Sequence, residues 1–225
     1  MKTTSFLVII SLVLANYANA QDNKPTQYLF GNNGKTSVTG FGAPIVQFWS
    51  KGGDFAVSSG GGGAVLINQT FFFGGYGMGM ATVHNVENLK VFQTNGTAVS
   101  YPTLRTNFGH GGLWLGYINN RKAAVHWGVS AKIGGGAINL MDADYDMTDH
   151  KGIGIDGVFV FIPQVEMEMN INRWFKINIG AGYQLVSGVD KTYINASKEV
   201  VKYYNSSDYN SPQLSISFLF GGFGR

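Results

Sequence analysis

The sequence has 225 residues, of which 44% are hydrophobic, 14% aromatic and only 13% charged, with a net charge of +3. Its basic residues are scattered rather than interleaved with aromatic side chains, which argues against a nucleic-acid partner. Cysteine is absent, and this excludes both disulfides and a lipid-modified cysteine anchor. The many glycines, 32 in all, together with the aromatic residues favour closely packed, strongly curved strands.

The N-terminus has the layout of a cleavable secretory signal. Lys2 precedes an apolar run from Phe6 to Leu14 and the small-residue end Ala18-Asn19-Ala20. That run is roughly half as long as a membrane-spanning helix requires, so we expect export through the Sec pathway and cleavage after Ala20. Residues 21–37 show no clear period and are predicted to form a short periplasmic lead.

The rest of the sequence alternates between apolar and polar residues with a period of two. The clearest run, Pro163 to Ile171, predicts a strand with one apolar and one polar face. Such runs last about nine to eleven residues, which is the length that a tilted strand needs to cross a bilayer. Eight strands are predicted on this basis: Val38–Trp49, Asp54–Leu66, Thr70–Thr82, Leu104–Ile118, Ala123–Ile138, Asp156–Ile171, Trp174–Ser187 and Gln213–Phe223.

The connections between the predicted strands differ in length in an ordered way. Short and long connections fall on opposite ends of an up-and-down barrel, as periplasmic turns and extracellular loops do. The first connection, Ser50–Gly53, is the exception, because it is short but lies at the end of the long connections. We therefore predict that residues 38–225 form an all-β, eight-stranded antiparallel up-and-down transmembrane β-barrel. The short connections are Ile67–Gln69, Asn119–Lys122 and Asn172–Arg173, and the long ones are Val83–Thr103, Asn139–Ile155 and Gly188–Pro212.

These features resemble the small eight-stranded outer-membrane β-barrel proteins, in particular those of the Bacteroidota, over nearly the whole chain. Signal peptides in that group often end as Ala20-Gln21 does here, and Ile216, Phe218 and Phe220 are similar to the family's C-terminal insertion signal. The resemblance implies a Gram-negative outer membrane, insertion by the barrel assembly machinery, and contact with outer-membrane lipid and lipopolysaccharide. It implies no activity, because the family is functionally diverse.

Charged residues occur on the strand face that we assign to the lumen. The interior of an eight-stranded barrel is filled by side chains, so charges there have to be paired. We expect Glu168 to pair with Lys176 and Glu166 with Asn178, and Lys132 to lie near Glu166. An interior ion-pair network would plug the lumen and disfavours general porin activity; a narrow gated pore is the alternative.

His126 and Ser130 suggest a different function. Outer-membrane lipid A deacylases are eight-stranded barrels with a His and a Ser on the barrel surface, and this resemblance makes an outer-leaflet lipid-modifying enzyme the alternative. The two residues are four positions apart, which is ~13 Å along a strand and too far for a hydrogen bond. They also point away from Trp127, on the face assigned to lipid. We therefore predict no enzymatic activity and no cofactor.

Two long connections contain further candidate residues. Asp142, Asp144 and Asp146 begin like a calcium-binding loop, but Met147 and Ile153 stand where that loop needs Gly and Glu. We predict a solvated acidic loop without a resident metal, with weak divalent-ion binding as the alternative. The last connection is predicted to form a protruding ribbon around the turn Ser197–Glu199, and its tyrosines suit contact with an extracellular protein: Tyr193, Tyr203, Tyr204 and Tyr209. We predict a variable solvated loop there, with such partner contact as the alternative.

The sequence thus predicts a non-enzymatic outer-membrane barrel with a structural or cell-surface interaction role. A soluble secreted β-barrel or sandwich that binds a ligand is the remaining alternative, because such proteins also alternate apolar and polar residues.

Overall fold

The computed structural model describes residues 36–92, 97–142, 154–195 and 197–223. The predicted signal peptide and nearly all of the predicted lead lie outside this part of the chain. The described residues form strands and one short 3-10 helix: β1 Val38–Lys51, β2 Asp54–Ile67, β3 Phe71–Met80, β4 His84–Phe92, β5 Ala98–Ile118, β6 Val125–Asp142, β7 Gly154–Asn170, β8 Phe175–Ser187, β9 Thr192–Ile194, β10 Val200–Lys202, η1 Ser206–Tyr209 and β11 Ser211–Gly221.

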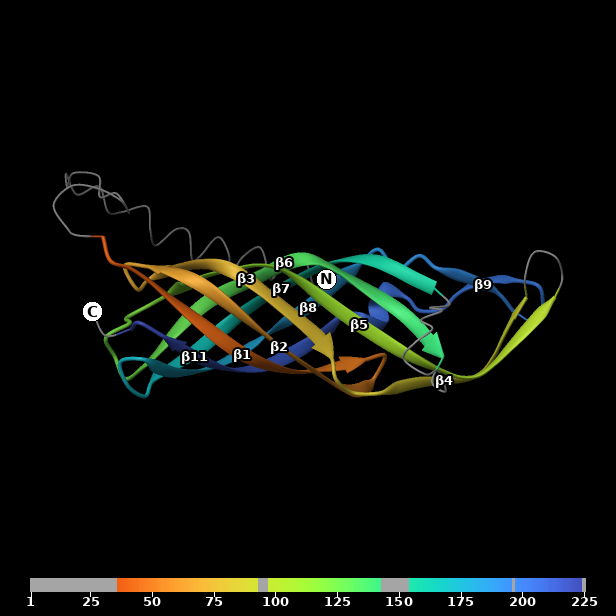
Figure 1. Ribbon diagram of the computed structural model, residues 1–225, viewed down its shortest axis with the longest axis horizontal. Coiled ribbons are helices and arrows are strands. Elements are labelled where there is room, and N and C mark those ends of the chain that lie inside the picture. Colours follow the sequence, from red (N-terminus) through yellow and green to blue (C-terminus); the bar gives the residue numbers. More distant parts are fainter. Residues whose placement is uncertain (1–35, 93–96, 143–153, 196, 224–225) are drawn as a thin grey trace, which may run out of the picture. The chain divides into compact units, whose positions relative to one another are not determined.

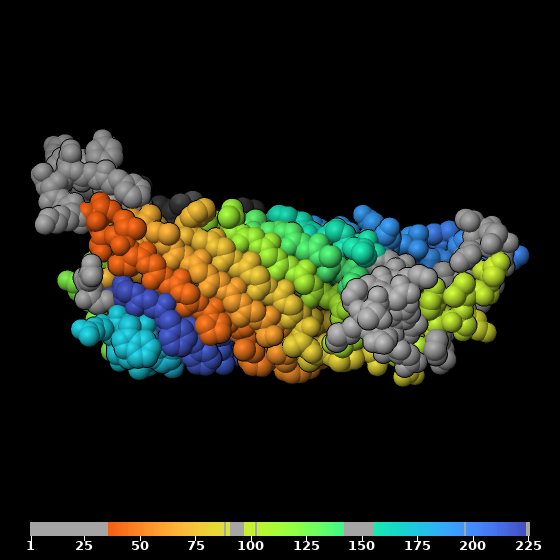
Figure 2. Space-filling view, viewed as in Figure 1, coloured from red at the N-terminus to blue at the C-terminus, as the bar shows by residue number. Residues whose placement is uncertain are grey.

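Eight of these strands close into an antiparallel barrel. Their order is β3-β2-β1-β11-β8-β7-β6-β5, and a further pairing of β3 with β5 completes the ring. Figure 2 shows β11, β1 and β2 as adjacent oblique stripes on the barrel surface. The predicted eight-stranded antiparallel barrel is confirmed, and each predicted strand coincides with one strand of the ring.

The barrel has two different ends. One end carries the connections from Ile67 to Phe71, from Ile118 to Val125 and from Asn170 to Phe175, and we call it the turn end. The other, the loop end, carries the remaining connections, with β4 and β9 beyond it in Figure 1. The exceptionally short connection at the loop end is a hairpin whose central residues, Gly52 and Gly53, have φ angles of 58° and 103°. Glycine reaches such positive φ values at little steric cost.

The connection predicted over Val83–Thr103 is instead largely a hairpin. Strand β4 pairs with the first part of β5, from Phe92 opposite Ala98 to His84 opposite Thr106. Apolar alternation could not reveal it, because strands outside a membrane need backbone pairing but no apolar face. The predicted ribbon in the last connection is present: β9 and β10 pair from Thr192 opposite Lys202 to Ile194 opposite Val200.

The two faces of the barrel wall have inverted polarity. Large apolar side chains point outward, among them Trp127, Val165 and Met167, which are 51%, 60% and 44% exposed. Between them along the same strands, Glu166 and Glu168 point inward and are buried. The alternation in the sequence therefore separates an apolar outer surface from an interior that contains charges.

Candidate functional site

Glu168, on β7, is the centre of a buried group of charges in the turn-end half of the lumen. Its Oε1 atom accepts a hydrogen bond from Lys176 Nζ of β8 at 2.5 Å and lies 2.9 Å from His126 Nε2 of β6. All three side chains are at most 5% exposed. Strand alternation directs one residue from each of three neighbouring strands into the lumen, where the Lys176 ammonium group compensates the Glu168 carboxylate.

The backbone register behind this group differs from the predicted one. Glu168 pairs with Asn178, and Lys176 pairs with Asn170, so the register of β7 against β8 lies two residues away from the predicted one. The predicted side-chain contact still forms, since a lysine side chain is long enough to reach the residue two positions along the neighbouring strand. Asn178 is displaced in the same way and donates to Glu166 Oε2 at 2.9 Å.

Glu166 is the centre of a second buried group. It accepts hydrogen bonds from Ser130 Oγ at 2.5 Å and from Gln164 Nε2. Lys132 was expected beside Glu166, but its Nζ atom donates to Gln164 Oε1 at 3.2 Å and thus reaches the carboxylate through this amide. Lys132 also lies over the Trp114 ring, 5.3 Å from its centroid, in an arrangement that favours a cation.

Four buried glutamines, none of which was predicted as a site residue, complete the polar interior. Gln213 of β11 donates to the same Oε1 atom of Gln164 and extends the second group, whereas Gln47 of β1 donates to Gln184 of β8 in a separate pair. Each is buried. The pattern that predicted the charged residues of the lumen could also have predicted these glutamines. In both cases a polar residue occupies a lumen-facing position of an alternating strand.

His126 and Ser130 do not form a pair with one another. His126 contacts Glu168, whereas Ser130 donates to Glu166, and both side chains are buried on the lumen side of β6. Each residue holds a carboxylate in place, as expected of interior polar groups that must be satisfied.

Opposite the charged groups, the lumen is filled by aromatic and aliphatic side chains. In the turn-end half, Phe41, Phe72 and Trp114 of β1, β3 and β5 pack edge to face with ring centroids 5.2–5.6 Å apart. Two glycines make room for these rings, since a Cβ atom at Gly116 would lie 2.2 Å from the Phe72 ring and one at Gly62 would lie 3.0 Å from Trp114. We call this region of β1, β2, β3 and β5 the aromatic wall, and the charged region of β6, β7 and β8 the charged wall.

The loop-end half of the lumen contains a second apolar cluster that includes part of the last connection. Tyr209 of η1 is fully buried against Trp49 and Phe108, and the Tyr204 ring packs against it. Tyr209 therefore offers no surface for contact, contrary to expectation, because η1 folds back over the barrel mouth. Tyr193 and Tyr203 differ, since they stack on the β9–β10 ribbon with centroids 4.8 Å apart.

Burial raises the pKa of the Tyr209 phenol, and the neighbouring Tyr204 and Asp208 raise it further. Its hydroxyl has no hydrogen-bond partner within the described ranges. The side chain thus acts in this cluster as an apolar ring rather than as a proton donor or acceptor.

Most of the acidic loop after β6 lies outside the described residues, including Asp144 and Asp146. Across the described ranges, no three His, Asp or Glu side chains are grouped in a way that could hold a metal ion. The described residues also include no helix that is long and apolar enough to cross a membrane.

No protein-family model and no curated protein matches the chain. Among solved structures, the crystal structure of Neisserial surface protein A (NspA) superposes with a TM-score of 0.47 and 9% sequence identity, over 84% of this chain and 99% of that chain.

Proposed function

We propose that the chain is an integral outer-membrane β-barrel with a closed lumen and a structural or cell-surface interaction role. The observation that carries this proposal is the inverted polarity of the barrel wall. Lys132, Lys176, Glu166 and Glu168 are at most 4% exposed, while Val65, Phe73, Leu113, Val165 and Leu214 are 45–60% exposed on the outer surface. In water, an exposed apolar outer surface of this extent would be unfavourable, whereas a bilayer around the barrel solvates it.

The outer surface also has the layering of a membrane barrel. Near the turn end, exposed Phe71, Trp127 and Trp174 form a girdle of aromatic side chains, as is usual where a barrel meets the lipid headgroups. Toward the loop end, the outward positions of β5 change from Leu113 to the polar residues Asn107 and Arg105. The apolar band on β5 thus spans about nine residues, enough for a tilted strand to cross the hydrocarbon core.

The contacts in the lumen support a plugged barrel rather than a porin. The charged wall faces the aromatic wall directly, since Trp114 Nε1 donates to Ser130 Oγ at 3.4 Å and Lys132 lies over the Trp114 ring, 5.3 Å from its centroid. An interior of this size is filled by its own side chains. The same contacts support a non-enzymatic role, because His126 and Ser130 are turned away from the surface that would meet outer-leaflet lipid.

The loop end is the part best suited to a surface interaction. The β4–β5 hairpin and the β9–β10 ribbon extend backbone edges that can pair with a partner strand, and Tyr193 and Tyr203 add a stacked aromatic surface. Placing the long connections outside the cell follows the usual orientation of such barrels.

Fractionation of cells that express the full chain tests the membrane assignment. We expect a mature protein that begins at Gln21, stays with the outer membrane after a carbonate wash, and migrates differently before and after boiling. Recovery as a soluble monomer without detergent would contradict the proposal and favour the soluble binder.

Reconstitution in a planar bilayer tests the lumen: we expect no steady conductance, and stable single-channel currents would favour the narrow pore. Lipid A mass spectrometry of a deletion strain tests the absence of enzymatic activity.

A further inference from the structure

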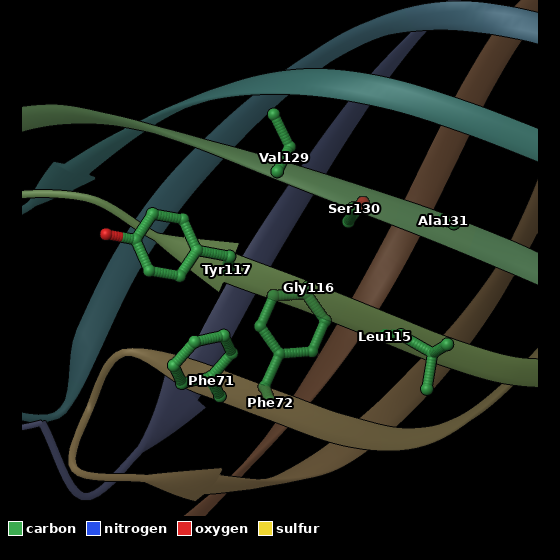
Figure 3. A pocket seen from close by; sticks show the side chains of 8 residues that line it. All are labelled: Phe71, Phe72, Leu115, Gly116, Tyr117, Val129, Ser130 and Ala131. Atoms are coloured by element: carbon green, nitrogen blue, oxygen red, sulfur yellow. The ribbon is translucent and has the colours of Figure 1, made fainter. Parts of the chain in front are cut away.

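The outer surface near the turn end contains an apolar groove that the role proposed above does not use. It has a volume of about 400 Å³ and spans β3, β5 and β6, within the range of roughly 300–1,000 Å³ typical of ligand sites. Figure 3 shows the Phe71 ring beside Tyr117, with Val129 and Leu115 at the sides. Ala131 is the smallest outward residue of this region, and its short side chain leaves the groove open.

A polar pocket of about 260 Å³ adjoins the groove on the side of the turns. Tyr117 lines both cavities and is their shared boundary. The polar pocket is also lined by Thr70, Asn120, Arg121 and Lys122. An apolar channel that ends in a basic, hydroxyl-bearing pocket matches a molecule with a hydrocarbon chain and an anionic head.

The charge of the turn end matches such a head. Its connections contain Arg121, Lys122 and Arg173 and no acidic residue, whereas the described exposed acids, among them Asp190 and Glu199, lie at the loop end. Arg121 Nη1 donates to the Asn68 carbonyl, which fixes the guanidinium at the pocket. A guanidinium has five N–H donors and matches the geometry of a phosphate, so Arg121 can hold the turn and a phosphate together.

We propose that this surface binds one anionic phospholipid of the membrane leaflet at the turn end. Its phosphate contacts Arg121 and Lys122, and one acyl chain lies in the groove over Ala131 between Tyr117 and Leu115. This proposal rests on the membrane location proposed above. The aromatic girdle places Tyr117 at the depth where lipid headgroups and acyl chains meet, which is where the polar pocket and the groove join.

Native mass spectrometry of the folded mature barrel in detergent tests the site, with dioleoyl phosphatidylglycerol and dioleoyl phosphatidylcholine as probes. We expect tighter binding of the phosphatidylglycerol, and about fivefold weaker binding for each of Arg121→Gln and Lys122→Gln, because each removes one basic contact. Ala131→Leu fills the groove and should weaken both lipids. Glycerol phosphate without acyl chains should not displace the lipid; displacement at equal concentration would refute the role of the groove.

Two variants serve as matched controls. Arg173→Gln removes a basic residue of the same end outside both cavities, and Ala137→Leu adds the same bulk on the outer face of β6 toward the loop end. Both should bind like the wild type, and equal losses in the controls and the site variants would refute the site. A chain that inserts into vesicles but binds both lipids equally refutes the site alone, whereas a chain that fails to insert refutes the membrane role as well.

Discussion

The aromatic wall and the charged wall line the same lumen and are stabilised by different physical means. In the aromatic wall, Trp114 and Phe72 fill volume over glycines, and their contribution scales with the apolar area removed from water. In the charged wall, Glu168 and Lys176 are stable only as partners, because either charge alone would be buried without compensation. The comparison teaches that a narrow barrel can tolerate a buried charge that has an oppositely charged or hydrogen-bonding partner. It also predicts that the two walls respond differently to double substitutions.

The largest effect is expected in the aromatic wall. Trp114→Ala should reduce the free energy of unfolding by about 3–5 kcal/mol, because it removes a fully buried ring and leaves a cavity. Urea unfolding of the barrel in detergent measures the loss. Adding Phe41→Ala should reduce the free energy of unfolding further, because a second truncation enlarges the cavity and cannot refill it. Partial recovery in the double variant would show that this wall does not act through volume.

The charged wall should lose about 3 kcal/mol in Lys176→Met, which leaves the Glu168 carboxylate with only His126 as a partner. Here the second substitution, Glu168→Gln, should restore much of the stability. A double-mutant cycle followed by urea unfolding measures the coupling directly. A coupling below about 0.5 kcal/mol would mean that water separates the two groups, and would favour the narrow pore.

The outer face should respond to charge according to depth. Met167→Arg places a charge in the apolar band toward its turn-end side, at an expected cost of about 2 kcal/mol in lipid vesicles. Asn139→Arg, on β6 beyond the loop-end edge of the band, is the control and should cost less than about 0.5 kcal/mol. Similar costs at the two sites would remove the membrane as the reason for the apolar surface.

The smallest effect is expected at Tyr209. Tyr209→Phe should change stability by less than about 0.5 kcal/mol at neutral pH, because the buried hydroxyl has no described partner to lose. Because the pKa of the Tyr209 phenol is raised in the folded chain, the unfolded chain releases the phenol proton at a lower pH than the folded chain does. The stability that is linked to the neutral phenol is therefore fully present below about pH 10 and falls as the pH rises above it. The wild type should therefore lose stability relative to Tyr209→Phe in alkaline urea titrations, and parallel curves would argue against burial of the phenol.

The sequence by itself determined the eight strands of the ring and the two faces of the wall. These are local properties, because a period of two directs Gln164 inward and Val165 outward whatever surrounds them. It also identified the charges of the lumen, since Lys132, Glu166, Glu168 and Lys176 all occupy the polar positions of alternating runs.

The contacts of Glu168 with Lys176 and of Glu166 with Asn178 were predicted from the sequence, but only the tertiary structure decided the register beneath them and the partner of Lys132. The register between β7 and β8 differs by two residues from the predicted one, and the side chains of Lys176 and Asn178 reach their carboxylates diagonally across the two strands. Likewise, burial of Tyr209 and the groove over Ala131 depend on strands that closure of the ring brings together. Contacts across a barrel join residues far apart in the chain, and no period along one strand contains them.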